Sequence, residues 1–147
     1  ILLGLETLGP RMNKHVSNAE YIASFLSSKE EVSWVLYPSL RSHKDCDLAN
    51  TLLPKGAGAI ISFGIRGGKA VAIKFIEKLE LFSHLANVGD AKSLVIHPAS
   101  TTHSQLNQKE LKESGVSEDM IRLSIGIESL DDLIKDLNRG LKVAKKI

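Results

Sequence analysis

Two short stretches in which apolar and polar residues alternate constrain the fold more than any other feature of the sequence. The first runs over residues 57–65 and the second over residues 121–127. Successive side chains of an extended strand point to opposite faces, so each stretch predicts a strand with one apolar face. These faces carry Ala59, Ile61, Phe63 and Ile65 in the first stretch and Leu123, Ile125 and Ile127 in the second. Such strands need helices over one face of a small sheet.

Helical patterns dominate the two ends of the chain. Residues 10–28 and 130–144 carry apolar residues at the three- and four-residue spacing of an amphipathic helix. Leucines continue the first stripe upstream through residues 2–8. We therefore expect this helix to start earlier, to bend at Gly9-Pro10 and to leave an apolar surface exposed.

Shorter elements complete the expected order. We predict strands at 32–36 and 93–97. Short helices are expected near 45–52 and after Gly67-Gly68. A further helix should run from a Ser104 cap to Ser114-Gly115, and the last should follow a capping box at Ser129 and Asp132. With the short helix near 45–52 left aside, the order helix, strand, strand, helix, strand, helix, strand, helix is typical of an α+β layer and not of a repeating parallel βαβ sheet. No linker or repeat interrupts it, so residues 1–147 are predicted to form a single domain.

The composition excludes several classes of protein. Hydrophobic residues make up 43% of the chain and charged residues 24%, which is an ordinary globular mixture. The 19 Lys and Arg against 17 Asp and Glu leave a net charge of +2 without a dense basic stripe, so we expect no nucleic-acid partner. No apolar run approaches the length of about 18 residues that suggests a membrane span.

The cysteine count and the first residues bear on processing and location. The single cysteine, Cys46, cannot form an internal disulfide, which excludes a disulfide-rich secreted scaffold. The sequence opens on Ile1-Leu2-Leu3 without a methionine or a signal-peptide pattern. We therefore expect a chain cut inside a longer, cytoplasmic protein.

Patterns for metal and phosphate sites are incomplete. His97 and His103 are separated by a proline, and no Cys-x-x-Cys or His-Glu-x-x-His pattern occurs, so no metal site is predicted. Glycines and a lysine at residues 64–70 resemble a phosphate loop superficially. The Walker pattern requires a glycine and a hydroxyl where Phe63 and Ala70 stand, so a simple turn is expected.

Arg122 interrupts an otherwise apolar run. A guanidinium in such a place is costly unless an anion meets it. Two partners stay open, namely an Asp or Glu of the same chain and the carboxylate of a ligand, which a planar guanidinium can bind through two hydrogen bonds. Residues 98–103, at the end of a predicted strand, include three hydroxyl side chains and a histidine. Binding residues often lie on loops at such places.

Motifs distributed along the whole chain carry a family resemblance. They are LANVGDAKSLVIHPASTTH at 85–103, IRLSIGIE at 121–128, LETL at 5–8, RM at 11–12, LPKGAG at 53–58, FGI at 63–65 and GV at 115–116. Together they resemble the C-terminal domain of the Cys/Met-metabolism enzymes that depend on pyridoxal phosphate (PLP). Asn87-Val88 is the variant associated with the O-acetylhomoserine sulfhydrylase branch.

The resemblance implies a fold and a set of binding residues. The fold would be the small C-terminal domain of a fold-type I PLP-dependent transferase, with a short, mostly antiparallel sheet covered by helices on one face. Arg122 would bind the α-carboxylate of an amino-acid substrate, Thr102 would lie near it, and Asn87 with the backbone of Val88 would contact the same group. The cofactor's lysine, phosphate turn and aspartate belong to a large domain and have no matching motif here, so the chain carries no catalytic or cofactor-binding residue.

The implied activity is the synthesis of homocysteine from O-acetylhomoserine and sulfide, a step of methionine biosynthesis. PLP would be held by the large domain, and the complete enzyme would be a homo-oligomer, commonly a tetramer. The chain alone would be inactive. Alternatives are another γ-elimination or γ-replacement enzyme, such as methionine γ-lyase or cystathionine γ-synthase, and a free-standing non-enzymatic domain that binds an amino acid or a partner chain.

Overall fold

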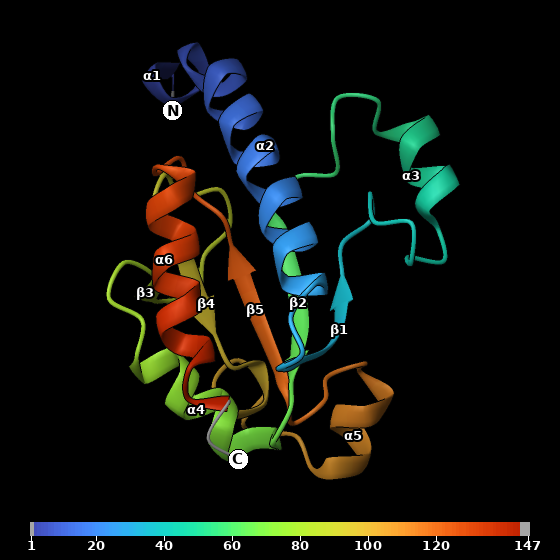
Figure 1. The fold of residues 1–147 in the computed structure, drawn as a ribbon. Coiled ribbons are helices and arrows are strands. Elements are labelled where there is room, and N and C mark those ends of the chain that lie inside the picture. The colour runs from blue at the N-terminus through green and yellow to red at the C-terminus, as the bar shows by residue number, and fades with distance from the viewer. Residues whose placement is uncertain (1, 145–147) are drawn as a thin grey trace.

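The computed structural model describes residues 2–144 and is organised around a five-stranded sheet (Figure 1). The strands are β1 (Val32–Leu36), β2 (Ile60–Ile65), β3 (Ser83–His84), β4 (Leu94–Ile96) and β5 (Met120–Ser124). They lie in the order β1-β2-β5-β4-β3, and every neighbouring pair is antiparallel except β3 with β4. The predicted α+β fold with a mostly antiparallel sheet is confirmed.

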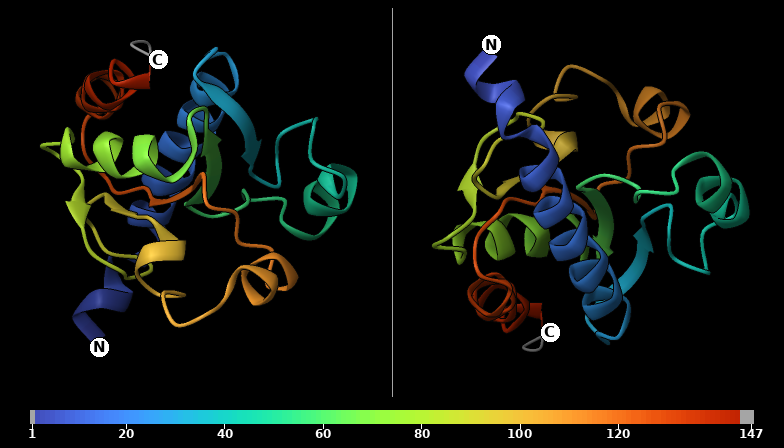
Figure 2. Two further views of the ribbon diagram at one scale, coloured as in Figure 1. Left: turned by 90° about the horizontal axis from the view of Figure 1, so that it is seen from below. Right: turned by 90° about the horizontal axis from the view of Figure 1, so that it is seen from above.

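Three of the helices pack over one face of this sheet and form the core with it. The helices are α1 (Leu2–Glu6), α2 (Leu8–Ser27), α3 (Cys46–Leu52), α4 (Gly68–Glu77), α5 (Gln108–Glu113) and α6 (Leu130–Leu141), with a 3₁₀ turn at Pro98–Ser100. Buried side chains of α2, α4 and α6 form one hydrophobic core with Ile61, Phe63 and Leu123 of the sheet. Figure 2 shows α4 and α6 on one side of the sheet and α5 on the other. None of the helices within residues 2–144 is long and apolar enough to cross a bilayer.

The N-terminal helix is interrupted earlier than predicted. The break falls at Thr7, between α1 and α2, and not at Gly9-Pro10. Pro10 has no N–H to donate to the carbonyl of Glu6, and its ring crowds that carbonyl, so the helix cannot run through this point. Within α2, Pro10 occupies the first turn, where a missing N–H costs nothing. The expected apolar exposure is confirmed, because Leu2 is 78% and Leu5 57% exposed on the projecting α1 (Figure 1).

Two predicted helix caps differ from the structure. Ser104 does not cap α5, which begins after Asn107. The Asn107 Oδ1 accepts from the N–H groups of Lys109 and Glu110, and the Glu110 carboxylate accepts from the Asn107 N–H, so both halves of a capping box form there. Ser129 precedes α6 but makes no side-chain cap. Instead, the negative charges of Asp131 and Asp132 in the first turn stabilise α6 by interacting with the positive end of the helix dipole.

Asp136 on α6 fixes the turn that leads into β3. Its side chain is only 4% exposed. The carboxylate accepts hydrogen bonds from the N–H groups of Glu80 and Leu81, both at 2.9 Å, and of Phe82 at 3.2 Å. Arg139 pairs with it at 3.1 Å. This contact ties the edge of the sheet to the C-terminal helix.

Tyr37, directly after β1, provides a pH-dependent contribution to stability. It is 1% exposed, and its hydroxyl donates to the Gly58 carbonyl at 2.9 Å. Burial, with a smaller effect from the charge of Glu20, raises the pKa of Tyr37 to about 12 from 10.0. Because the folded state holds this proton more tightly than the unfolded state, the contribution is complete below pH 10 and is lost as the pH rises toward 12.

We therefore expect the free energy of unfolding in urea to fall between about pH 10 and about pH 12, and to fall less steeply in Tyr37→Phe. The exposed Tyr21 supplies the control, since Tyr21→Phe should leave the wild-type slope unchanged. Identical slopes in wild type and Tyr37→Phe would show that Tyr37 does not cause the decline.

Candidate functional site

Arg122 lies in the middle of β5, on the sheet face opposite the core helices. Ser62 of β2 pairs with it on one side and Ile96 of β4 on the other, and Leu36 of β1 continues the row. Neighbouring side chains of a strand point to opposite faces. Leu123 enters the helix-covered core with no exposed surface, and Arg122 consequently points to the open face.

The guanidinium of Arg122 has no protein partner among residues 2–144. The side chain is half-buried, and no described carboxylate or carbonyl forms an ion pair or hydrogen bond with it. The internal ion pair that the sequence left open is therefore absent from the described part of the chain. A guanidinium carries five N–H donors in a fixed plane, and that geometry matches the two oxygens of a carboxylate.

Ser124 adds a second unpaired polar group on the same face. It lies two residues after Arg122 on β5 and is 5% exposed, and its hydroxyl has no hydrogen-bond partner within the described residues. Buried hydroxyls are normally paired. The alternation over residues 121–127 puts Ser124 on the same face as Arg122, and this was the available signal for a residue that the family motifs gave no role.

Asn87 and Val88 lie on an exposed turn before β4. The Asn87 Oδ1 accepts from the N–H of Val88 at 2.8 Å, and the Asn87 amide approaches Asp90 at 3.5 Å. Gly89 has a φ of +76°, a conformation that other residues rarely adopt. The turn is thus closed by its own side chains, and the Val88 N–H must leave Asn87 before it can contact a ligand.

Thr102 lies beyond the other end of β4. It is exposed, and its hydroxyl is 2.8 Å from the Nδ1 of His103. The preceding 3₁₀ turn is fixed by His97, which is 1% exposed and whose ring nitrogens contact the Ser100 hydroxyl and the Glu118 carbonyl, both at 2.8 Å. The loop that carries Thr102 therefore starts from a rigid base.

The four predicted residues lie around the strand pair β4 and β5, and the hydrogen bond between Asn87 and Val88 is the one that joins any two of them within the described residues. Leu94, at the start of β4, pairs with Ser124, and Ile96, at its end, pairs with Arg122. The turn with Asn87 enters at the first end and the loop with Thr102 leaves at the second. No hydrogen bond or ion pair joins Arg122 to the other three residues in the described structure. The arrangement is an open surface with one cationic centre.

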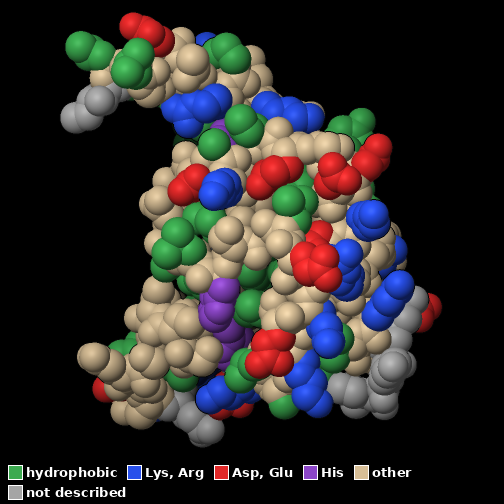
Figure 3. All heavy atoms as spheres, turned by 90° about the vertical axis from the view of Figure 1, so that its left-hand side faces the viewer, with side chains coloured by type: hydrophobic (Ala, Val, Ile, Leu, Met, Phe, Trp, Pro, Cys, Tyr) green, Lys and Arg blue, Asp and Glu red, His purple; other side chains and the backbone are tan. Residues whose placement is uncertain are grey.

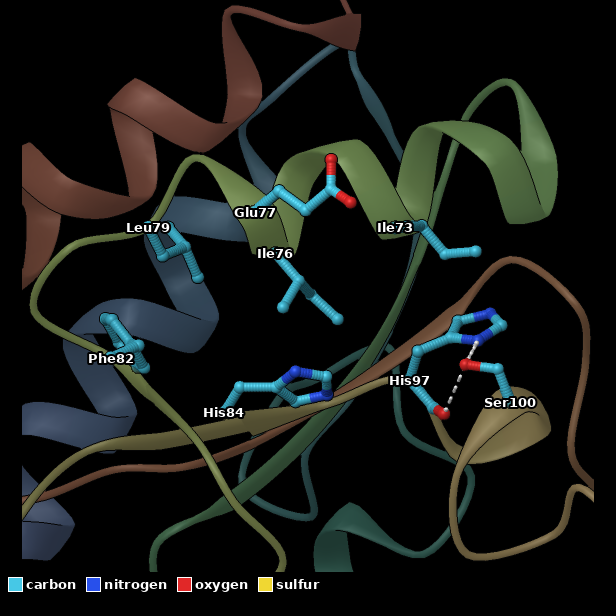
Figure 4. Close-up of a pocket in the computed structure, with 8 residues that line it drawn as sticks. All are labelled: Ile73, Ile76, Glu77, Leu79, Phe82, His84, His97 and Ser100. Carbon is cyan, nitrogen blue, oxygen red and sulfur yellow. Dashed lines mark hydrogen bonds between the residues drawn. The ribbon is translucent and has the colours of Figure 1, made fainter.

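One cavity lies elsewhere, at the edge of the sheet beneath α4. It has a volume of about 440 Å³, and Figure 3 shows histidine side chains in this hollow. Ile76 lines it from α4, while His84 and His97 line it from the strand side (Figure 4). His97 already uses both ring nitrogens, with Ser100 and with the Glu118 carbonyl. None of the four predicted residues lines this cavity, and we assign it no chemistry.

Neither the row around Arg122 nor the glycine turn before α4 is arranged as a PLP site. The family resemblance implies that the cofactor is bound through a lysine amine, and the residues that pair in the row around Arg122 include no lysine. In the glycine turn before α4, Arg66 donates to the Glu30 carbonyl at 2.7 Å, and Lys69 in the first turn of α4 is exposed. Within residues 2–144 no three His, Cys, Asp or Glu side chains gather as metal ligands would.

Comparisons with known proteins agree along the whole chain. The family of Cys/Met metabolism PLP-dependent enzymes matches residues 1–142. The chain is 49% identical to homocysteine synthase of Schizosaccharomyces pombe over 144 residues, which are 98% of this chain and 34% of that protein. It is 47% identical to O-acetyl-L-homoserine sulfhydrylase 1 of Thermus thermophilus over 141 residues, which are 96% of this chain and 34% of that protein.

A solved structure agrees as well. Cystathionine gamma synthase of Xanthomonas oryzae pv. oryzae, in complex with cystathionine, is 39% identical and superposes with a TM-score of 0.92 over 99% of this chain and 37% of that chain. The chain thus spans about a third of the length of the relatives it matches. With the fold, the sequence motifs and these comparisons in agreement, the chain belongs to the Cys/Met-metabolism PLP-dependent enzyme family.

Proposed function

We propose that this chain is the C-terminal, substrate-binding part of an O-acetylhomoserine sulfhydrylase, which makes homocysteine from O-acetylhomoserine and sulfide in methionine biosynthesis. The observation that carries the proposal is the half-buried, unpaired guanidinium of Arg122 on the open face of the sheet. The relatives' names support the choice of reaction, since identity to the sulfhydrylase and homocysteine synthase exceeds identity to the cystathionine gamma synthase.

In this proposal the remainder of the enzyme holds PLP, which draws electrons from the substrate when bound. Arg122 binds the α-carboxylate with two parallel N–H···O bonds, and Ser124 offers a hydroxyl on the same face. Asn87 and the backbone of Val88 approach from one loop and Thr102 from the other. Together they orient the Cα–H bond for deprotonation while acetate leaves Cγ and sulfide takes its place. Hydrogen bonds to charged groups contribute roughly 1.5–3 kcal/mol each, so the clamp dominates substrate orientation.

We expect Arg122→Lys in the full-length enzyme to raise KM for O-acetylhomoserine and to lower kcat, because the charge remains but the planar fork is lost. Arg122→Ala should lower kcat/KM further. Cofactor absorbance should stay almost unchanged, since PLP is held elsewhere. Homocysteine release measured over a range of O-acetylhomoserine concentrations tests this. An Arg122→Ala enzyme within about threefold of wild type in kcat/KM, which is under 1 kcal/mol, would overturn the assignment.

The stability of the 147-residue chain separates a ligand-binding arginine from a structural one. Arg122 has no ion pair to lose within residues 2–144, so Arg122→Met should change the free energy of unfolding by less than about 1 kcal/mol. Breaking a buried ion pair typically costs about 3–5 kcal/mol. Urea denaturation of both forms decides between these values. A loss in the larger range would make Arg122 a structural residue.

The chain alone is proposed to be inactive, because it lacks a lysine in the sequence context that the family uses for its cofactor. Adding PLP, O-acetylhomoserine and sulfide to the isolated chain should therefore yield no homocysteine, and any stoichiometric turnover would refute this.

The full-length enzyme is proposed to be a cytoplasmic homo-oligomer, commonly a tetramer in this family. Sedimentation of the full-length enzyme tests the oligomeric state. Turnover with water or cysteine but not with sulfide would favour a methionine γ-lyase or a cystathionine γ-synthase.

A further inference from the structure

We propose that Glu128 is a positioning residue that sets the Asn87–Val88 turn relative to Arg122. The inference rests on the proposed function, since it assumes that both parts meet one substrate. Arg122 lies on β5, whereas Asn87 and Val88 lie on a separate turn, and no hydrogen bond or ion pair joins the strand residue to the turn within residues 2–144. Their relative placement must therefore come from the segments that support them.

Glu128 links these supports through Ser93, the residue just before β4. One Glu128 carboxylate oxygen accepts from the Ser93 N–H at 2.6 Å, and the other accepts from the Ser93 hydroxyl at 2.8 Å. The same hydroxyl accepts from the N–H of Gly126 at 2.8 Å. Ser93 has no exposed surface, so these bonds are shielded from water. Three hydrogen bonds thus fasten the base of the turn to the segment that follows β5.

The same segment is held from the opposite side by α2. Asn18, which is 1% exposed, donates from its amide to the carbonyls of Gly126 and Glu128, both at 3.0 Å. His15 Nδ1 lies 2.6 Å from the Ile125 carbonyl, which can only accept, so the ring nitrogen donates. The position of Glu128 is therefore fixed independently of the turn that it supports.

Close packing leaves this junction little freedom. A Cβ atom at Gly126 would collide with the Glu128 carboxylate, the Ala91 carbonyl oxygen and the Ser93 nitrogen. The N–H of Ile127 also donates to the Ala91 carbonyl at 3.0 Å. A displacement of Glu128 must therefore be transmitted to residues 91–93, and through them to the turn.

The outer part of the turn contains only local hydrogen bonds. Asn87 accepts from Val88, and Asp90 accepts from the N–H of Lys92 at 3.0 Å. These bonds shape the turn but do not place it against β5. A carboxylate at position 128 can accept from both Ser93 donors, whereas a glutamine amide offers only one acceptor oxygen. Glu128→Gln therefore weakens the link and preserves the size of the side chain.

The test uses the full-length enzyme with Glu128→Gln, and Ser93→Ala as a second variant that removes the hydroxyl and keeps the N–H bond. Asp136→Asn is the matched control, because Asp136 is also a buried carboxylate that accepts backbone N–H groups but lies at the β3 edge. The measurements are KM for O-acetylhomoserine, KM for sulfide, kcat, the melting temperature and the hydrogen-exchange rates of the amides of residues 86–92.

We expect Glu128→Gln to raise KM for O-acetylhomoserine about tenfold, a change of about 1.4 kcal/mol, with kcat and KM for sulfide within about threefold of wild type. Exchange across residues 86–92 should accelerate. Ser93→Ala should show the same pattern at smaller size. Asp136→Asn should lower the melting temperature without raising KM or exchange in the turn.

Two results would overturn the inference. One is an unchanged KM with unchanged exchange in Glu128→Gln and Ser93→Ala. The other is an equal rise of KM in Asp136→Asn, which would make the effect one of general destabilisation. A wild-type enzyme that does not convert O-acetylhomoserine refutes the proposed function instead. In that case hydrogen exchange in the same variants still decides whether Glu128 fixes the turn.

Discussion

A guanidinium on an otherwise apolar strand requires an anion, and the surroundings of Arg122 contain none within residues 2–144. The strand itself cannot adapt, because β5 lies at the centre of the sheet and its other face is sealed by the core of α2, α4 and α6. The charge is therefore fixed in place on a half-buried surface. An oriented cation of this kind binds a carboxylate with little reorganisation.

The loops on either side of Arg122 depend on the same strand. The loop with Thr102 is anchored through His97, whose ring contacts a hydroxyl and a carbonyl. The turn with Asn87 is anchored through Ser93 and Glu128. In both cases the residue itself is exposed, but its base is held by buried hydrogen bonds. Under the proposed function, the substrate site would combine accessible contact groups with fixed supports.

Much of the fold could be predicted from the sequence, because alternation and helical spacing are direct records of which face is buried. They identified β2, β5, α2 and α6, and they placed Arg122 on the open face. The two-residue strand β3 was missed, since two residues show no period and the approach to it is held by Asp136, over fifty positions away in the sequence. The cap at Asn107 was missed because Ser104 offered an equally plausible oxygen.

The candidate site was only partly predictable for a similar reason. The family motifs pointed to Arg122, Asn87, Val88 and Thr102, but the link between Ser93 and Glu128 joins residues 35 positions apart and leaves no local pattern. The unpaired hydroxyl of Ser124 likewise emerges only when the neighbours of each atom are known. Both features depend on which distant segments come into contact, and the pattern of a single sequence does not show these contacts.

The most direct test of the account is a crystal structure of the full-length enzyme with O-acetylhomoserine bound. The account predicts two Arg122 guanidinium nitrogens at roughly 2.7–2.9 Å from the two oxygens of the substrate α-carboxylate. A substrate carboxylate bound elsewhere, with Arg122 paired to an Asp or Glu from the remainder of the enzyme, would contradict it.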